Sequence, residues 1–372
     1  MRPFEAVSTI LENLVSATPL ITTVIPTYRR PHLLRRAIRS VLDQSYPHFK
    51  ICVYDNASED ETAEVVNNLA RQDPRIHYHC HPNNIGAQDN FIFGLSRTET
   101  PYVHLLSDDD FLLPSFFAQA TSALDNNPDA AFFSGGMLSA NTDGGVRALL
   151  RYGPETDQAY RPPKLFQLLA SYTRTWTSAI FRRVALEALG GLKKETSYSF
   201  SIDLLLRSAT RFEAVLSDAP VAVFTVHAGS SSVAEAKEAF ESLLTLRFFE
   251  SVNAAVDSAL RDNIVTAKDA LAMKALFRTT MERTLFRGAL GMIARQELHL
   301  SLGASKLLAE VFNRRAKARI IRLAAMDNRI GLLSRFTLRN IRAARKLWFL
   351  NRAATHNSHY SDLVRRRLLE LA

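Results

Sequence analysis

The sequence predicts an α/β protein with a mostly parallel sheet that is covered by helices on both faces. Apolar, β-branched runs alternate with helical patterns between residues 20 and 124, and this alternation is typical of a parallel sheet because each crossover needs a returning helix. Polar clusters directly follow several of the runs. From residue 233 onward helical periodicity dominates and strand signals disappear. We therefore expect an α/β domain over residues 1–232 and a helical region over residues 233–372.

The elements of the first region follow from apolar periodicity and from the residues that start helices. We expect strands at residues 20–28, 49–54, 75–80 and 101–106, and helices at residues 31–44, 60–72, 86–96 and 115–124. Pro31 and Pro114 suit helix starts, and Ser58 suits the cap of the second helix.

After residue 140 the alternation weakens. Residues 177–191 predict a strand and a short helix that stops at Gly190 and Gly191, and residues 221–226 predict a further strand. Residues 153–164 contain three prolines and predict a mobile loop over a site.

Composition places the chain among ordinary globular proteins. It has 372 residues, of which 47% are hydrophobic and 22% are charged, which is enough for a sizeable core. The sequence has no apolar run of 18 residues and no secretory signal pattern, and Cys52 lies in an apolar run. We therefore expect a cytoplasmic protein without a disulfide framework. The absence of GxGxxG and GxxxxGK[ST] motifs disfavours a dinucleotide-dependent oxidoreductase and a P-loop NTPase.

The net charge of +9 is concentrated near the C-terminus. Residues 311–372 hold 15 Lys and Arg against 3 Asp and Glu, and the rest of the chain is slightly acidic. Residues 334–350 place apolar side chains, among them Phe336 and Trp348, near one helical face beside several arginines. This pattern predicts a peripheral contact with an anionic membrane surface, a helix packed on the α/β domain, or an oligomer interface. We do not expect nucleic-acid binding, because no nucleic-acid module surrounds this segment.

Three consecutive aspartates, Asp108, Asp109 and Asp110, stand between two apolar runs. Adjacent carboxylates near a core repel one another and are costly to desolvate, so a cation should compensate them. Mg²⁺ or Mn²⁺ suits such a site because these ions prefer oxygen ligands and share them with substrate phosphates. Taken alone, an acidic triplet is more often a solvated turn. Its place after a predicted strand, like that of residues 27–29 and 55–58, favours one shared site at an edge of the sheet.

The ordered set of motifs between residues 22 and 232 resembles the family 2 glycosyltransferases with the GT-A, Rossmann-like fold. The matching segments are TVIPTYRRPHLLRRAIRSVLDQSY, ICVYDNASEDET, NNIGAQDNFIFGL, YVHLLSDDDFLLP, TSAIFRRVALEALGG and VFTVHAGSSS. Each segment alone is weakly specific, but their common order is strongly specific. They extend over somewhat more than half of the chain.

The resemblance implies an inverting glycosyltransferase, such as a hexosyltransferase, that uses a UDP-, GDP- or dTDP-sugar. At the matching positions, Thr27 and Asp55 would contact the base and Asp108 the ribose. Asp109 would be the main ligand of Mn²⁺ or Mg²⁺, with Asp110 nearby and with His227 contacting the metal or the diphosphate. The expected donor-binding residues are Thr27, Tyr28, Arg29, Asp55, Asn84, Gly86 and Asp108. Arg29 departs from the family, which commonly has Asn at this position.

The catalytic base is the least regular part of the resemblance. The family usually places an Asp about six residues before an Arg in a Leu-rich helix. Here Asp203 lies four residues before Arg207, and Ser201 occupies the usual position. We expect Asp203 to deprotonate the acceptor hydroxyl, with Glu195 as the alternative base. The structural alternative is that Asp203 only stabilises the first turn of its helix.

Together these observations predict a metal-dependent glycosyltransferase that acts on a glycan or a lipid-linked acceptor. The family and the basic tail suggest the synthesis of a bacterial surface polysaccharide, such as lipopolysaccharide O-antigen or capsule, on the inner face of the membrane. The irregular position of the base leaves open a non-catalytic module that binds nucleotide sugars, and the tail leaves open a membrane-peripheral adaptor or a homo-oligomer.

Overall fold

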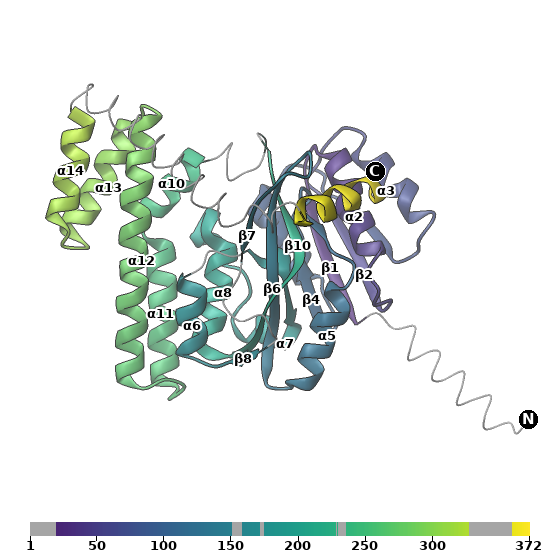
Figure 1. Ribbon diagram of the computed structural model, residues 1–372, viewed down its shortest axis with the longest axis horizontal. Helices are drawn as coiled ribbons and strands as arrows, with labels where there is room; N and C mark the ends of the chain where they lie inside the picture. The colour runs from purple at the N-terminus through teal and green to yellow at the C-terminus, as the bar shows by residue number, and fades with distance from the viewer. Residues whose placement is uncertain (1–19, 151–157, 172–174, 228, 230–235, 327–358) are drawn as a thin grey trace, which may run out of the picture.

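The computed structural model describes residues 20–150, 158–171, 175–227, 229, 236–326 and 359–372 (Figure 1). In these residues ten strands form one mixed sheet with helices on both faces, and a group of long helices lies beyond one face. The strands are β1 Ile21–Thr27, β2 Phe49–Asp55, β3 Ile76–Cys80, β4 Tyr102–Leu105, β5 Phe111–Leu112, β6 Ala130–Asn141, β7 Val146–Leu150, β8 Gln158–Tyr160, β9 Ala179–Arg182 and β10 Glu213–Val226.

Helices and strands alternate singly up to β4, then mix in short runs up to β10, after which only helices follow in the described residues. The helices are α2 Pro31–Leu42, α3 Thr62–Ala70, α4 Ala87–Ser96, α5 Phe116–Asn126, α6 Lys164–Ser171, α7 Arg183–Ala188, α8 Phe200–Arg211, α10 Ala236–Leu244, α11 Arg247–Arg261, α12 Ala267–Ala294, α13 Leu298–Glu310 and α14 Arg315–Met326. Two short 3-10 helices, η1 Trp176–Ser178 and η2 Lys194–Ser199, precede β9 and α8. A further helix over 359–370, the C-terminal helix, ends the described chain.

The strand order is β3-β2-β1-β4-β9-β6-β10-β5, with β7 beside β6 and β8 beside β10. Strands β3, β2, β1 and β4 are parallel neighbours, and β6 and β10 are also parallel. Strand β9 runs antiparallel to both β4 and β6 and so joins the two parallel groups. The predicted α/β class is therefore confirmed. The carboxyl ends of β1, β2, β4 and β10 all point to one edge of the sheet.

Each face of the sheet has its own apolar core. Helices α2, α3 and α5 cover one face. Helix α2 shows why: Pro31 starts it, and Leu34, Ile38 and Val41 form a fully buried stripe, each of which contributes roughly 1.5–3 kcal/mol relative to exposure. Helices α4, α6 and α8 cover the other face, and this core continues without a break into α11, α12 and α14.

Three local predictions differ from the structure. Ser58 does not cap α3, whose N-cap residue is Glu61; Ser58 bonds instead to Asp55. The short strand β5 directly after the aspartates was not predicted, because two residues are too few for a periodicity signal. Residues 153–157 of the predicted mobile loop lie outside the described residues, and its remaining part includes β8, which pairs with residues 214–216 at the start of β10, away from the carboxyl edge.

The C-terminal helix packs on the α/β region. Val364 and Leu371 are buried against Phe111 and against residues of β6 and β10, and Arg367 Nη1 lies 3.0 Å from Asp43 Oδ2, just after α2. The C-terminal helix therefore adopts one of the arrangements that the basic tail predicts. The apolar face around Phe336 and Trp348 lies outside the described residues. The division at residues 232 and 233 stays a prediction.

Candidate active site at the carboxyl ends of the strands

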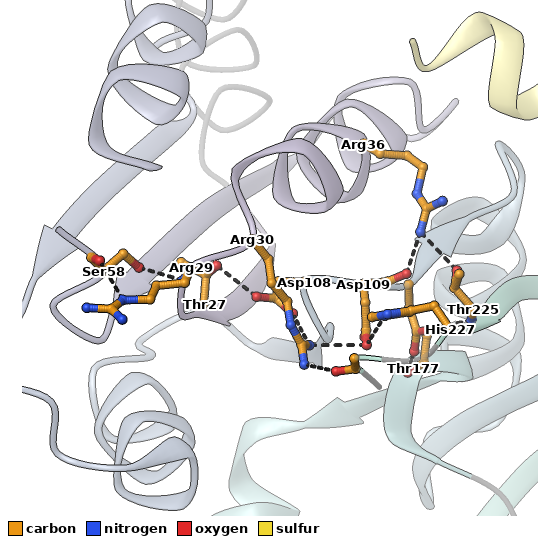
Figure 2. A network of polar contacts seen from close by, with 12 residues as sticks. Thr27, Arg29, Arg30, Arg36, Ser58, Asp108, Asp109, Thr177, Thr225 and His227 are labelled. Carbon is orange, nitrogen blue, oxygen red and sulfur yellow. Dashed lines mark hydrogen bonds and ion pairs between the residues drawn. The ribbon is translucent and has the colours of Figure 1, made fainter. Parts of the chain in front are cut away.

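The acidic motif, Asp108–Asp110, lies where the polypeptide leaves β4, beside the ends of β1 and β10 (Figure 2). Asp108 accepts a hydrogen bond of 2.8 Å from the Thr27 hydroxyl. Asp109 Oδ2 lies 3.1 Å from His227 Nε2. The structure thus brings together residues of β1, β4 and the end of β10 that are as far as 200 positions apart in the sequence.

Arg30, which the sequence reasoning missed, is the cation of this group. Its Nη1 lies 3.1 Å from Asp108 Oδ1 and 3.2 Å from Asp109 Oδ2, and its Nη2 donates to the carbonyl of Gly229. The sequence does show an arginine just before Pro31, in the loop that follows β1. It does not show whether Arg29 or Arg30 contacts the aspartates.

Asp110 turns away from the other two carboxylates into the protein. It is fully buried, and its oxygens accept hydrogen bonds from the Thr177 hydroxyl at 2.8 Å and from the backbone N–H of Thr225 at 2.9 Å. This arrangement ties the acidic motif to η1 and β10. The role of Asp110 as a metal ligand stays a prediction, and its geometry is that of an anchor.

Burial and mutual repulsion dominate the electrostatics of the motif. Burial, and then the charge of Asp109, raises the pKa of Asp108 to about 6, and the same two causes hold the pKa of Asp110 well above its usual value. Arg36 in α2 partly offsets this charge: its guanidinium donates to the Asp109 carbonyl and, at 2.9 Å, to the Thr225 hydroxyl. Burial lowers the pKa of Arg36. The motif is therefore a site whose negative charge Arg30 and Arg36 compensate only in part.

The loop after β2 forms the neighbouring part of the site. Asp55 is buried and accepts bonds from the Ser58 hydroxyl at 2.6 Å, the Ser58 N–H at 3.0 Å and the Tyr78 hydroxyl at 2.6 Å. Since a carboxylate has about four acceptor directions, one remains for a ligand. Arg29 donates to the Ser58 carbonyl at 3.0 Å and stacks over the half-exposed Tyr28 ring at 5.1 Å.

Arg29 has a left-handed backbone with φ of 55°, and this conformation is consistent with the Asn that the family commonly has here, not with the Arg. Asn tolerates the left-handed region better than most residues, so the commoner residue suits this turn. The hydrogen bonds from Arg29 to Ser58 hold the less suited residue in place.

Asn84 and Gly86 stand beside the β2 loop. Asn56 Nδ2 donates to Asn84 Oδ1 at 2.8 Å, and Asn56 Oδ1 accepts from the N–H of Ile85 at 2.8 Å. Gly86 has φ of 87°, and its N–H donates to Asn84. The predicted donor-binding residues, Asp108 included, therefore lie at or just after the ends of four parallel strands, β1, β2, β3 and β4, at one edge of the sheet.

The predicted base is placed differently. Asp203 in α8 is fully buried, and its Oδ2 accepts from Arg207 Nε at 2.6 Å. Arg207 in turn donates to the carbonyls of Leu189 and Gly191. We call Asp203 and Arg207 the buried ion pair. Its burial closes Asp203 to an acceptor in this geometry, and Glu195 is exposed on η2. Both base assignments stay predictions.

The spacing of Asp109 and His227 can be compared with the ligand geometry of a divalent cation, and their roles as metal ligands stay predictions. Asp109 Oδ2 and His227 Nε2 are 3.1 Å apart, which is close to the roughly 3 Å that separates adjacent ligands of an octahedral Mg²⁺ or Mn²⁺ at about 2.1 Å. Within the described residues no group of three or more His, Cys, Asp and Glu side chains is arranged to hold a metal. The coordination shell of a metal at this site would therefore be completed by substrate oxygens and water, as that of Mg²⁺ commonly is.

None of the described helices combines the length and apolarity that crossing a bilayer requires.

Comparison with known proteins identifies the family of this region. Residues 22–190 match the family model for glycosyl transferase family 2. Over 96 residues the chain is 38% identical to the GalNAc(5)-diNAcBac-PP-undecaprenol beta-1,3-glucosyltransferase of Campylobacter jejuni, a match that covers 26% of this chain and 31% of the relative. Over 92 residues it is 33% identical to the putative teichuronic acid biosynthesis glycosyltransferase TuaG of Bacillus subtilis, covering 25% and 36%. These matches span about a third of either relative.

The fold extends further than the sequence matches. The structure of S. aureus TarS 1–349 in complex with UDP-GlcNAc has a TM-score of 0.62 to this chain at 14% identity, and the likeness covers 84% of this chain and 92% of that one. The GT-A fold that the motifs predict is therefore confirmed. The family match includes Thr27, Asp55 and the acidic motif, and it ends before the buried ion pair and His227. Residues 22–190 of the chain therefore match glycosyl transferase family 2, and the likeness to TarS adds the fold alone.

Proposed function

We propose that this protein transfers a sugar, with inversion, from a nucleotide-sugar donor to a glycan or lipid-linked acceptor. The observation that carries the proposal is the meeting of Asp109 and His227, 3.1 Å apart, beside Asp108 and Thr27 at the carboxyl edge of the sheet. A carboxylate in such a position can accept a hydrogen bond from a ribose hydroxyl. It can approach the diphosphate of a donor only if a cation between them compensates the negative charge of both. The family match and the relatives named above support the reaction class.

The donor nucleotide would lie over the loops after β1, β2 and β3. The free acceptor direction of Asp55 suits a base N–H, and the Tyr28 ring beside it offers a face for stacking. Asp108, held by Thr27, suits a ribose hydroxyl. UDP-, GDP- and dTDP-sugars all fit this description. The shared fold with TarS, which was solved with UDP-GlcNAc, makes UDP-GlcNAc the first donor to test.

Asp109 and His227 would hold Mn²⁺ or Mg²⁺. The ion would neutralise charge on the diphosphate as it leaves. The protein's own part is to fix the two ligands: Arg36 holds the backbone of Asp109, and Asp110 holds the backbone of Thr225, two residues before His227. Both anchors keep the ligand pair in place without contacting the donor.

In the transfer, the acceptor oxygen bonds to the anomeric carbon as the bond from that carbon to the diphosphate oxygen breaks. The diphosphate leaves with the electron pair, and the acceptor proton passes to a base. Asp203 would take this proton only if η2 and α8 opened, because its carboxylate is buried in the described structure. Glu195, exposed on η2, is the alternative base.

The acceptor belongs to bacterial surface polysaccharide synthesis in this proposal. The Campylobacter relative is named for a PP-undecaprenol acceptor, and the Bacillus relative for teichuronic acid biosynthesis. The excess of basic residues beyond residue 311 would suit a peripheral position at the inner membrane face, near a lipid-linked acceptor. O-antigen and capsule remain the expected products, and a homo-oligomer stays a prediction.

A screen of UDP-, GDP- and dTDP-sugars with Mn²⁺ or Mg²⁺ tests the proposal. We expect transfer from one donor class, an inverted anomeric configuration of the product by NMR, and tighter nucleotide binding when the metal is present. Asp109→Asn is the matched variant, because it removes one charge and keeps the side-chain shape. A complete lack of metal-enhanced nucleotide binding across the three nucleotides would contradict the proposal.

A second candidate function has one observation in its favour. The burial of Asp203 would suit a non-catalytic module that binds nucleotide sugars and recruits partners. The two functions separate in one experiment: tight, metal-dependent nucleotide binding together with no turnover of any donor, including hydrolysis, supports the module.

A further inference from the structure

We propose that Arg30 is the resident counter-cation of the acidic motif, and that it must leave Asp109 before a divalent cation can bind. On this proposal Arg30 moves to the donor diphosphate and thereby couples metal binding to donor binding. The inference rests on the proposed function, because it concerns the metal and the donor proposed for this site.

The position of the guanidinium carries the first step. One nitrogen, Nη1, bridges Asp108 and Asp109 at 3.1 and 3.2 Å, and Figure 2 shows it between the two carboxylates. A metal about 2.1 Å from Asp109 Oδ2 would stand within a few ångström of Nη1. Two cations at that separation repel strongly in a partly buried site. The ion and the guanidinium therefore compete for the same carboxylate oxygen.

Asp109 is held more firmly than Arg30. Arg36, which is largely buried, donates to the Asp109 carbonyl and to the Thr225 hydroxyl, and stacks over the Phe111 ring at 4.8 Å. The Arg30 side chain is 27% exposed; one nitrogen contacts the two carboxylates, and the other donates to the carbonyl of Gly229, in an exposed contact that the carbonyl can exchange for a hydrogen bond to water. The side chain that yields to an incoming ion is therefore Arg30.

A donor diphosphate offers Arg30 a better partner. Guanidinium groups pair bidentately with phosphate oxygens, and such bonds are stronger than single-nitrogen contacts. When Arg30 turns to the diphosphate, Asp109 is left open to the ion beside His227. The nucleotide diphosphate should thus tighten metal binding, and the metal should tighten nucleotide binding by the same factor.

Binding of Mn²⁺, measured by electron paramagnetic resonance with and without UDP, tests the inference without any activity assay. The proteins are the wild type, Arg30→Gln, Arg30→Lys and Arg29→Gln. Without nucleotide, Arg30→Gln should bind Mn²⁺ about tenfold more tightly than the wild type, because one charge-assisted contact no longer competes. The enhancement of Mn²⁺ binding by UDP should shrink in the same variant by a similar factor.

Arg29→Gln is the matched control. It removes the same charge one residue away, from a guanidinium that contacts Ser58 and Tyr28 instead of the acidic motif. We expect less than a threefold change in its Mn²⁺ affinity without UDP, since an exposed charge is screened, and the control is confined to that state because Arg29 is itself an expected donor contact. Arg30→Lys keeps the charge and the fold, and its affinity should lie between those of the wild type and Arg30→Gln.

Equal Mn²⁺ affinities of the wild type and Arg30→Gln would overturn the inference while leaving the metal site intact. An equal gain in Arg29→Gln and Arg30→Gln would also overturn it, because general electrostatics would then suffice. A lack of Mn²⁺ binding in all four proteins, with and without UDP, would contradict the proposed metal site itself and remove the inference with it.

Discussion

The acidic motif and the buried ion pair both take carboxylates out of water, but they treat the charge in opposite ways. Asp203 has its own arginine, and both side chains are almost fully buried. Asp108 and Asp109 share one nitrogen of a partly exposed arginine, and Asp110 has hydrogen bonds but no ion pair of its own in the described residues. The first arrangement is closed to solvent and has its own counter-charge, although Asp203 Oδ1 has no hydrogen-bond partner in the described residues. The second shares one partly exposed cation among more than one carboxylate and so keeps part of its negative charge uncompensated.

This difference separates stability from function. A complete buried pair is destabilised when either partner is removed. A crowded acidic site costs the free protein stability and regains it when a cation or ligand binds. Removing a carboxylate should therefore damage the fold in one region and the chemistry in the other.

The largest effect on stability is expected for Asp203→Ala, which tests whether the buried ion pair is structural. It leaves Arg207 buried without its partner, so the free energy of unfolding should fall by about 4 kcal/mol in urea denaturation. The double variant with Asp203→Leu and Arg207→Met replaces the pair by apolar groups and should recover much of this loss. A loss below 1 kcal/mol in Asp203→Ala would contradict the structural role. A folded double variant without transfer would instead support Asp203 as the base.

The pH dependence of the free energy of unfolding tests His104, a buried residue next to the acidic motif. Burial lowers the pKa of His104 to about 4. Its Nε2 lies 3.0 Å from the carbonyl of Thr177, whose hydroxyl donates to Asp110. The unfolded chain binds a proton on His104 near pH 6.5, so this contribution is full above that pH and is lost as the pH falls toward 4. We expect a loss of about 3 kcal/mol from this group.

The control for the titration is His104→Phe, which should be less stable at pH 7 but should lack that part of the slope. The raised pKa of Asp108 acts in the opposite direction, because its protonation near pH 6 stabilises the folded state as the pH falls. Equal slopes for the wild type and His104→Phe between pH 7 and 4.5 would show that His104 is not held neutral.

Asp109→Asn should separate activity from stability. We expect transfer to fall about a hundredfold, because the ion and the leaving diphosphate lose a charged ligand. The melting temperature should stay the same or rise, since one of three crowded charges is gone. Asp110→Asn, whose amide can still accept from Thr225, is the neighbouring control and should affect transfer less. A clear drop in melting temperature for Asp109→Asn would contradict the comparison.

The smallest expected effect concerns backbone strain in the loop after β2. Ala57 has a left-handed φ of 60°, a conformation that costs a residue with Cβ about 1–2 kcal/mol. Ala57→Gly should raise the free energy of unfolding by about 0.5 kcal/mol once the greater freedom of glycine in the unfolded chain is included. Ala63→Gly, in α3, should lower it by up to about 1 kcal/mol. Melting temperatures that change in the same direction in both variants would contradict strain at Ala57.

Much of the donor half of the site could be predicted from the sequence. Buried strands such as β1 and β4 have strong apolar signals, and the polar residues that follow them must meet at one edge when the strands are parallel. Arg30 and Arg36 were missed because their roles depend on side-chain direction, which periodicity does not give. The acceptor half was harder, because the spacing of Asp203 and Arg207 fits both a first-turn acid and a buried ion pair.

The C-terminal helix packs beside the acidic motif, but the ribosome synthesises it long after the motif itself. Phe111, immediately after Asp110, shares its apolar cluster with Val364 and Leu371, and the contact between Asp43 and Arg367 joins residues 324 positions apart. At about 5–20 residues per second, a ribosome needs roughly a quarter of a minute to a minute between the two. During that time Phe111 and its apolar neighbours lack the side chains of Val364 and Leu371, so the edge of the sheet that carries the acidic motif forms without the support of this helix.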